Sequence, residues 1–174
     1  MYGAFGTKAD LLKALLDVVI GGDDDDVALL DRANPQLVRL ATDQYRQIAL
    51  FADGITAQLE RVRPLDDILR SAAAVDPAAA DLRADLQLRQ RRDAMRTVVS
   101  WIAANGPLRE GTTQEDAAAI VWTLTSAEVH QMMRDVWGWP QERFIDWLRE
   151  TLTTSLLPAR PAKENGPKSA KSGT

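Results

Sequence analysis

Residues 76–107, DPAAADLRADLQLRQRRDAMRTVVSWIAANGP, show the organisation that is found along the whole chain. The segment begins with an Asp-Pro pair, which is typical of a helix start, and ends with Asn-Gly-Pro, which terminates a helix. Between them lie residues that favour helix, and the apolar ones recur at helical intervals. This apolar stripe comprises Leu82, Leu86, Met95, Val98, Val99 and Ile102. We therefore predict one amphipathic helix from Asp76-Pro77 to Asn105.

The same pattern predicts helices on both sides of this segment. They are expected over residues 8–20, 35 to about 63, 65–75, 113–137 and 141–157, with a short helix or turn at 27–30. Pro35 and Pro64 each fit the first position of a helix, and Asn34 caps the former. Thr113 and Asp116 have the spacing of a capping box. No segment alternates with a two-residue period, so the predicted fold class is all-α, a bundle of about seven helices.

The composition excludes several classes of function. The chain has 174 residues, of which 45% are hydrophobic, enough for one domain with a core. It has no cysteine and a single histidine, His130, so no thiolate or histidine-cluster metal site is expected. No nucleophile, phosphate-loop or metal motif is present, and we predict neither an enzyme nor a cofactor. Asp23–Asp26 lack the ligand spacing of an EF-hand, which favours a solvated loop.

The charge and hydropathy patterns argue against DNA binding by this chain alone and against a membrane protein. The net charge is −4, and four basic residues lie in the tail after Leu157, so the rest of the chain is more acidic still. Nucleic-acid binders normally present a basic face. No apolar run approaches the roughly 20 residues of a membrane span, and no signal-peptide layout is present. A soluble cytoplasmic protein is expected.

The first twelve residues, MYGAFGTKADLL, carry a short motif. The motif resembles the end of the helix-turn-helix domain in TetR-family transcription regulators, where an apolar residue, a tyrosine and a phenylalanine end the recognition helix and a lysine and a leucine follow. Those places are taken here by Met1, Tyr2, Phe5, Lys8 and Leu11. Residues 119–129 and 137–148 likewise look like the last two helices of many family members. The resemblance covers residues 1–157.

The resemblance implies three parts of the chain. Residues 1–20 would be a remnant of the helix-turn-helix domain, residues 27–157 a ligand-binding and dimerisation domain, and residues 158–174 a disordered tail. Family members have two whole helices before the tyrosine, so a late start codon or a truncation is expected. Tyr2 and Lys8 match positions that contact DNA phosphates, and such contacts position without specifying sequence. An operator would be bound only by a full-length form.

The resemblance also implies an effector pocket among the middle helices. Its candidate residues are Tyr45, Phe51, Ile55, Met95, Val99, Trp101, Trp122 and Thr125. Gln44 and Gln47 lie near the same apolar stripes and could supply polar contacts, and no charge sits clearly on a buried face. The expected effector is therefore small and hydrophobic or amphipathic. The alternative is that these side chains form an ordinary core.

In the same family the last two long helices pair with those of a second subunit, which implies a homodimer. The candidate interface residues are Leu124, Glu128, Met132, Phe144, Trp147, Leu148 and Leu152. The alternative is that they close the core of one subunit. His130 lies on the same helix and is expected in a core or an interface, with a pH-sensitive ligand contact as the other possibility.

Arg89, Arg91, Arg92 and Arg96 form a basic segment, which could bind nucleic acid or an acidic ligand. Acidic residues one turn away favour a solvated ion-pair face instead. The sequence thus predicts a ligand-responsive TetR-family regulator, reduced here to its effector-binding and dimerisation portion. The alternatives are a DNA-independent dimeric module that binds a small molecule or a paralogue, and an inert fragment.

Overall fold

The computed structural model describes Ala14, Leu30 and residues 32–159. The helices in residues 32–159 are α2 (Ala33–Leu40), α3 (Gln44–Ala73), α4 (Pro77–Arg83), α5 (Arg91–Ala104), α6 (Gln114–Leu124), α7 (Ala127–Gln131) and α8 (Gln141–Leu156), with the π-helical segments η2 (Ala84–Gln90) and η3 (Met132–Val136). This part of the chain contains no strand, and the all-α prediction is confirmed. Apart from Ala14, the predicted helix 8–20 lies outside the described residues, as do the acidic loop 23–26 and the tail from Arg160.

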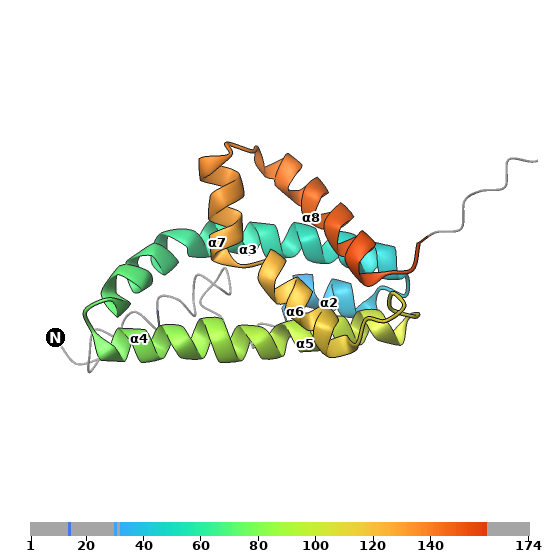
Figure 1. The fold of residues 1–174 in the computed structure, drawn as a ribbon, viewed down its shortest axis with the longest axis horizontal. Helices are drawn as coiled ribbons and strands as arrows, with labels where there is room; N and C mark the ends of the chain where they lie inside the picture. Colours follow the sequence, from blue (N-terminus) through green and yellow to red (C-terminus); the bar gives the residue numbers. More distant parts are fainter. Residues whose placement is uncertain (1–13, 15–29, 31, 160–174) are drawn as a thin grey trace, which may run out of the picture.

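The segments α4, η2 and α5 form one continuous rod along the lower edge of the molecule (Figure 1). The Asp76 side chain accepts a hydrogen bond of 2.9 Å from the Ala78 amide, and Pro77 occupies the first turn, as predicted. Asn105 ends the helix, also as predicted. The seven-residue π-helical segment in the middle is a feature that the sequence pattern did not indicate.

The predicted long helix from Pro35 is wrong in one respect, because it is divided into α2 and α3. Ala41 is extended, and the Asp43 side chain accepts a hydrogen bond of 2.7 Å from the Arg46 amide, which caps a new helix. The buried Gln47 then donates through Nε2 to the Val38 carbonyl at 3.0 Å. This bond holds the end of α2 against the start of α3.

The prediction of a new helix at Pro64 is also wrong, since α3 runs through it to Ala73. A proline inside a helix removes one backbone hydrogen bond and bends the helix. The second half of α3 curves away from the first (Figure 1). Val62 and Asp66, on either side of the proline, are both buried. Packing on both sides of Pro64 therefore keeps the segment helical despite the lost bond.

The predicted helix 113–137 has the expected start but is broken at Thr125. Thr113 and Asp116 form the predicted capping box. α6 ends at Leu124, and the Ser126 hydroxyl accepts a hydrogen bond of 3.1 Å from the Val129 amide to begin α7. The chain turns sharply between the two helices (Figure 1). The N-cap thus sets the direction in which α7 and η3 leave the core.

Two apolar clusters hold the helices together. The main one joins α2, α3, α5, α6 and α8. α8 contributes Phe144, Leu148, Leu152 and Leu156, each with no exposed surface. A smaller cluster joins the second half of α3 to α4 and η2 through Val62, Leu69, Ala79 and Leu86. The rod of α4, η2 and α5 spans both clusters and so fixes the spacing between them.

The Ser126 cap should be measurable in the stability of the fold. We expect Ser126→Ala to lower the free energy of unfolding by about 1 kcal/mol, because the first turn of α7 loses a bond to an otherwise unpaired amide. Ser100→Ala is the control, since Ser100 is exposed within α5 and caps nothing. Urea unfolding followed by circular dichroism measures both. Equal stability of the two variants would contradict the assigned break.

Candidate functional site

The eight predicted effector residues all lie in the main core or at its edge. Phe51, Ile55, Met95 and Val99 are buried in it, and Tyr45, Trp101 and Trp122 are partly buried against it. Thr125 is fully buried at its edge. The structure therefore brings the predicted residues together. Its close apolar packing is also what the alternative of an ordinary core requires.

A half-buried cation lies at one end of this core. Arg91 donates through Nη2 to the Trp122 carbonyl and, at 2.9 Å, to Oγ1 of Thr125. Its guanidinium carbon lies 5.1 Å from the centre of the Trp122 ring, a cation–π distance. The Thr125 hydroxyl is also 3.8 Å from the sulfur of Met95. We call Met95, Arg91, Trp122 and Thr125 the Arg91 cluster.

The environment of Arg91 is low in water. Burial lowers the pKa of Arg91 to about 10, while the charges of Glu128 and Asp66 act in the opposite direction. The expectation that Arg91 lies on a solvated face was wrong, as was the expectation that no charge is buried, since Asp66 is only 2% exposed. A cation, a hydroxyl, an indole and a thioether side by side offer polar contacts at the end of an apolar core.

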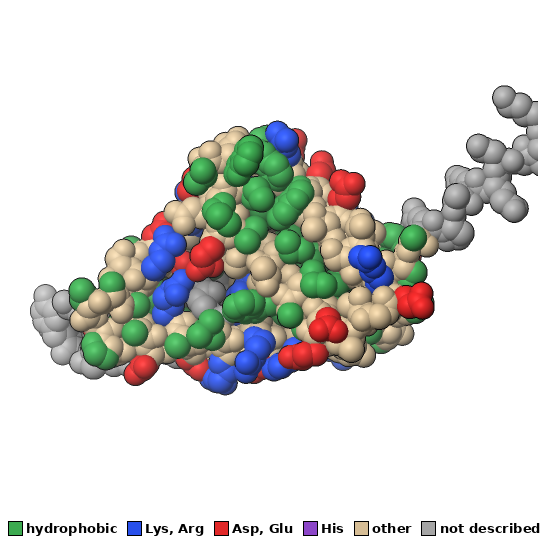
Figure 2. Space-filling view, in the orientation of Figure 1, with side chains coloured by type: hydrophobic (Ala, Val, Ile, Leu, Met, Phe, Trp, Pro, Cys, Tyr) green, Lys and Arg blue, Asp and Glu red, His purple; other side chains and the backbone are tan. Residues whose placement is uncertain are grey.

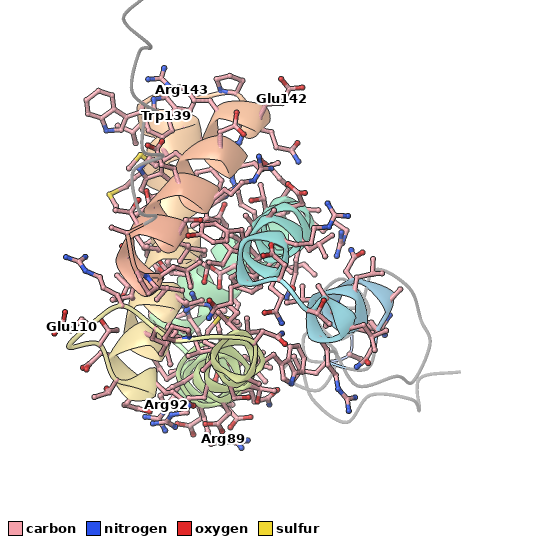
Figure 3. The ribbon with its side chains drawn as sticks, turned by 90° about the vertical axis from the view of Figure 1, so that its right-hand side faces the viewer. Arg89, Arg92, Glu110, Trp139, Glu142 and Arg143 are labelled. Carbon is pink, nitrogen blue, oxygen red and sulfur yellow. The ribbon has the colours of Figure 1, made fainter. Side chains whose placement is uncertain are left out.

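The other arginines of the basic segment behave as predicted. Arg89 pairs with Asp85 at 2.5 Å, and Arg96 pairs with Asp93 at 3.1 Å and with Glu115. Figure 3 shows Arg89 of η2 and Arg92 of α5 on the side of this rod that faces away from α3. The expectation of a solvated ion-pair face is therefore confirmed for Arg89 and Arg96, and only Arg91 turns inward.

Charged side chains also connect the rod and α3 to α7. Arg83 pairs with Glu128 at 2.9 Å, and Arg70 donates to Oε1 of Gln131 at 3.2 Å. Figure 2 shows a hollow in this face of the molecule, with basic and acidic side chains around it. Glu128 was predicted as an interface residue, but its carboxylate is engaged within one subunit.

A second charged cluster joins α3 to η3 and the turn before α8. Arg134 donates through Nε to Oε1 of Glu60 at 2.7 Å and through Nη1 to the Trp139 carbonyl. His130, which is 1% exposed, places Nε2 3.2 Å from the same Glu60 oxygen, without the alignment of a hydrogen bond. Arg63 of α3 pairs with Asp135 of η3 at 2.6 Å. We call these five side chains, Glu60, Arg63, His130, Arg134 and Asp135, the Glu60 cluster.

The Glu60 cluster perturbs two titrating groups. Burial lowers the pKa of His130, the charges of Arg134 and Arg63 lower it further, and Glu60 opposes them. Burial raises the pKa of Glu60, but the hydrogen bond from Arg134 and the charges of His130, Arg134 and Arg63 together bring it below its usual value. Glu60 is therefore an anion that faces two cations, Arg134 and Arg63. The expectation of a core histidine at His130 is confirmed, with its ring edge-on to Phe144 at 5.0 Å.

Three of the residues predicted for the dimer interface are buried within a single chain. Phe144, Leu148 and Leu152 have no exposed surface in a single chain, because α8 packs them against α3 and α6. Leu124 and Trp147 are partly buried against the same core. Of the predicted residues, Met132 is the exposed apolar one, at 50%. The alternative, in which these helices close the core of one subunit, holds for the buried face of α8.

A different apolar surface covers η3 and the start of α8. Val136 and Trp137 are 78% and 71% exposed and lie beside Met132. Trp139 stacks edge-on against Trp147 with ring centres 5.9 Å apart. Figure 2 shows apolar side chains gathered at this end of the molecule, and Figure 3 shows Trp139 and Arg143 there. We call Met132, Val136, Trp137, Trp139 and Trp147 the apolar tip.

Sequence reasoning missed Val136 and Trp137 as surface residues. Both belong to a helix with an apolar side, and a helical period alone does not tell which apolar residues are covered. The Gly138-Trp139-Pro140 turn was the available signal, because a turn lies at the surface and exposes what adjoins it. Gly138 has φ of 68°, in the left-handed region that favours glycine, which closes this turn.

Comparison of the chain with protein-family models, with curated proteins and with solved structures finds no match. Among the described residues, no helix is both long and apolar enough to cross a membrane. The same part of the chain holds no group of histidine and acidic side chains arranged to bind a metal ion. Tyr2 and Lys8, the predicted phosphate contacts, lie outside the described residues.

The role of Arg91 can be tested by a matched pair of substitutions. We expect Arg91→Met to lower the free energy of unfolding by roughly 1–3 kcal/mol, because it removes a donor from the Trp122 carbonyl and from Thr125. Arg92→Met is the control, since Arg92 is exposed beside Arg91 in the sequence, and it should change stability by less than about 0.5 kcal/mol. Urea unfolding measures both. An equal effect of the two would contradict an inward-facing Arg91.

The lowered pKa of His130 predicts destabilisation by mild acid. The unfolded chain binds a proton at a higher pH than the folded chain, so stability should fall as the pH drops below about 6.5. Chemical unfolding at a series of pH values from 7.5 to 5.5 measures the slope. Since His130 is the only histidine, His130→Gln should flatten this slope. A wild-type profile as flat as that of the variant would refute the prediction.

Proposed function

We propose that this chain is the effector-binding and dimerisation portion of a TetR-like, ligand-responsive transcription regulator. The observation that carries the proposal is the apolar tip on η3 and α8. These are the last two helical segments, which the family resemblance assigns to subunit pairing. The proposal is of a cytoplasmic regulator and not of an enzyme.

The composition of the apolar tip supports a protein interface. Other exposed large apolar side chains of residues 32–159 are Leu37, Leu40, Ile68, Val75 and Leu88, which are distributed over α2, α3, η2 and the turn before α4. The tip differs because three exposed apolar side chains lie close together in the sequence, in η3 and directly after it, and Trp139, which contacts Trp147, follows shortly after them. Contiguous exposed apolar surface is uncommon on monomers. Tryptophan and methionine are enriched in interface cores.

The charges around the tip favour a second copy of the chain as the partner. Glu142 and Arg143 are exposed at the start of α8, and Asp146 is exposed one turn further along the same helix. Figure 3 shows Glu142 and Arg143 at the same end as Trp139. A rim that carries both signs can match itself across a twofold axis, whereas a strongly one-signed rim would repel its copy.

The proposed effector site is the main core with the Arg91 cluster at its end. Apolar side chains of α3, α5 and α6 would surround the body of a small molecule, and Arg91 and Thr125 would contact its polar group. The effector is accordingly an amphipathic one. It would act by binding unequally to two arrangements of the subunits, as any population shift requires. DNA contact through Tyr2 and Lys8 would need a complete helix-turn-helix.

Sedimentation velocity tests the pairing on which this proposal rests. We expect the wild-type chain to sediment as a dimer at micromolar concentration, and Val136→Glu to raise the dissociation constant by about tenfold or more, because it places a charge in an apolar interface. Val75→Glu is the control, since Val75 is 86% exposed but lies outside the tip. A wild-type monomer, or equal dissociation constants for the two variants, would overturn the assignment of the tip.

A further inference from the structure

The Trp139 turn is fixed at both of its backbone polar groups. Its amide donates to the Met133 carbonyl at 3.0 Å, which ties the turn to its own helical segment η3. Its carbonyl accepts from Nη1 of Arg134. The indole of the same residue contacts the Trp147 ring. The guanidinium carbon of Arg143 also lies over it, 4.5 Å from its ring centre. The orientation of this indole within the apolar tip therefore depends on how the turn is held.

Arg134 connects that turn to a different helix. Its Nε atom donates to Oε1 of Glu60 in α3, and the two side chains are only 20% and 29% exposed. A guanidinium is planar, so one side chain that binds a carboxylate and a carbonyl at once holds their relative position. Glu60 is itself kept ionised by its surroundings, since its pKa lies below the usual value. The ion pair is thus maintained throughout the neutral pH range.

We infer that the Glu60–Arg134 ion pair positions the Trp139 turn and thereby sets the affinity of the apolar tip for a second copy of the chain. The inference rests on the proposed dimerisation, and it identifies the contact on which the strength of that dimerisation depends. Glu60 lies on α3, the helix that also carries Phe51 and Ile55 of the main core. A displacement of α3 in the main core would therefore reach the Trp139 turn through Arg134, the side chain that binds both Glu60 and the Trp139 carbonyl.

The neighbouring groups give the pair no substitute partner. Arg63 is engaged by Asp135 at 2.6 Å. His130 approaches the same Glu60 oxygen as Arg134 without hydrogen-bond alignment, and burial favours its neutral form at pH 7. Loss of the Glu60 charge would consequently weaken the hold on Arg134 while the apolar contacts of the tip remain.

The experiment compares dimer dissociation constants by sedimentation at pH 7.5. We expect Glu60→Gln, which keeps the shape of the side chain, and Arg134→Met to raise the dissociation constant by about tenfold. Arg134→Lys keeps a cation for Glu60 but lacks the planar fork that also reaches the Trp139 carbonyl, so it should raise the dissociation constant as well. The matched control is Asp53→Asn. Asp53 of α3 forms an ion pair with Arg149 of α8 at 3.3 Å, and this pair lies outside the tip.

The outcomes separate the inference from the proposed function. Far-UV circular dichroism and the urea midpoint establish that each variant is folded, and Asp53→Asn gives the effect of losing an α3–α8 ion pair on stability alone. A wild-type dimer whose dissociation constant is unchanged in Glu60→Gln, or changed equally in Asp53→Asn, would refute the inference and leave dimerisation standing. A monomeric wild-type chain would refute the proposed pairing, and the inference with it.

Discussion

The packing of α8 against α3 and α6 decides what the last helices can do. Phe144, Leu148 and Leu152 are placed one turn apart on a face with no exposed surface. A buried side chain of this size contributes roughly 1.5–3 kcal/mol through the removal of its surface from water. These residues cannot serve a second subunit without unfolding the first. In the part of the chain that the structure describes, the exposed methionine and tryptophan lie instead on η3 and just before the start of α8.

Once α8 is fixed, the angle at which α7 and η3 leave the core depends on polar groups. Ser126 caps α7, and Arg91 donates to the Trp122 carbonyl at the end of α6. Unpaired backbone groups at a helix end are costly in a region low in water, so both contacts are required where the chain turns. The Arg91 cluster thus has a structural role at the break between two helices, and its position at the edge of the main core gives it a potential functional one.

Local signals predicted the helix ends that depend on them, and tertiary contacts decided the rest. Asp76-Pro77, the Thr113–Asp116 capping box and Asn105 act within one turn, so the sequence pattern was sufficient. The continuation of α3 through Pro64 depends on burial of both flanks, which no local pattern records. The inward turn of Arg91 follows the π-helical segment η2, whose wider turn shifts the helical phase of every later residue. The eight effector candidates were brought together because they share helical stripes. Three of the interface candidates, Phe144, Leu148 and Leu152, lie in the core of one chain, because a stripe does not distinguish core from surface.

The energetics of the Glu60 cluster suit positioning better than stabilisation. Removing two charges from water costs free energy that their attraction recovers only in part, so a partly buried ion pair such as Glu60–Arg134 adds little net stability. An apolar pair of the same volume would stabilise the contact between α3 and η3 at least as well, but it could not hold the Trp139 carbonyl. The directional bonds of Arg134 specify one orientation of the turn. A contact of low net stability and high directional specificity is also one that a small displacement of α3 can disrupt, and this property is what a link between a core and a pairing surface requires.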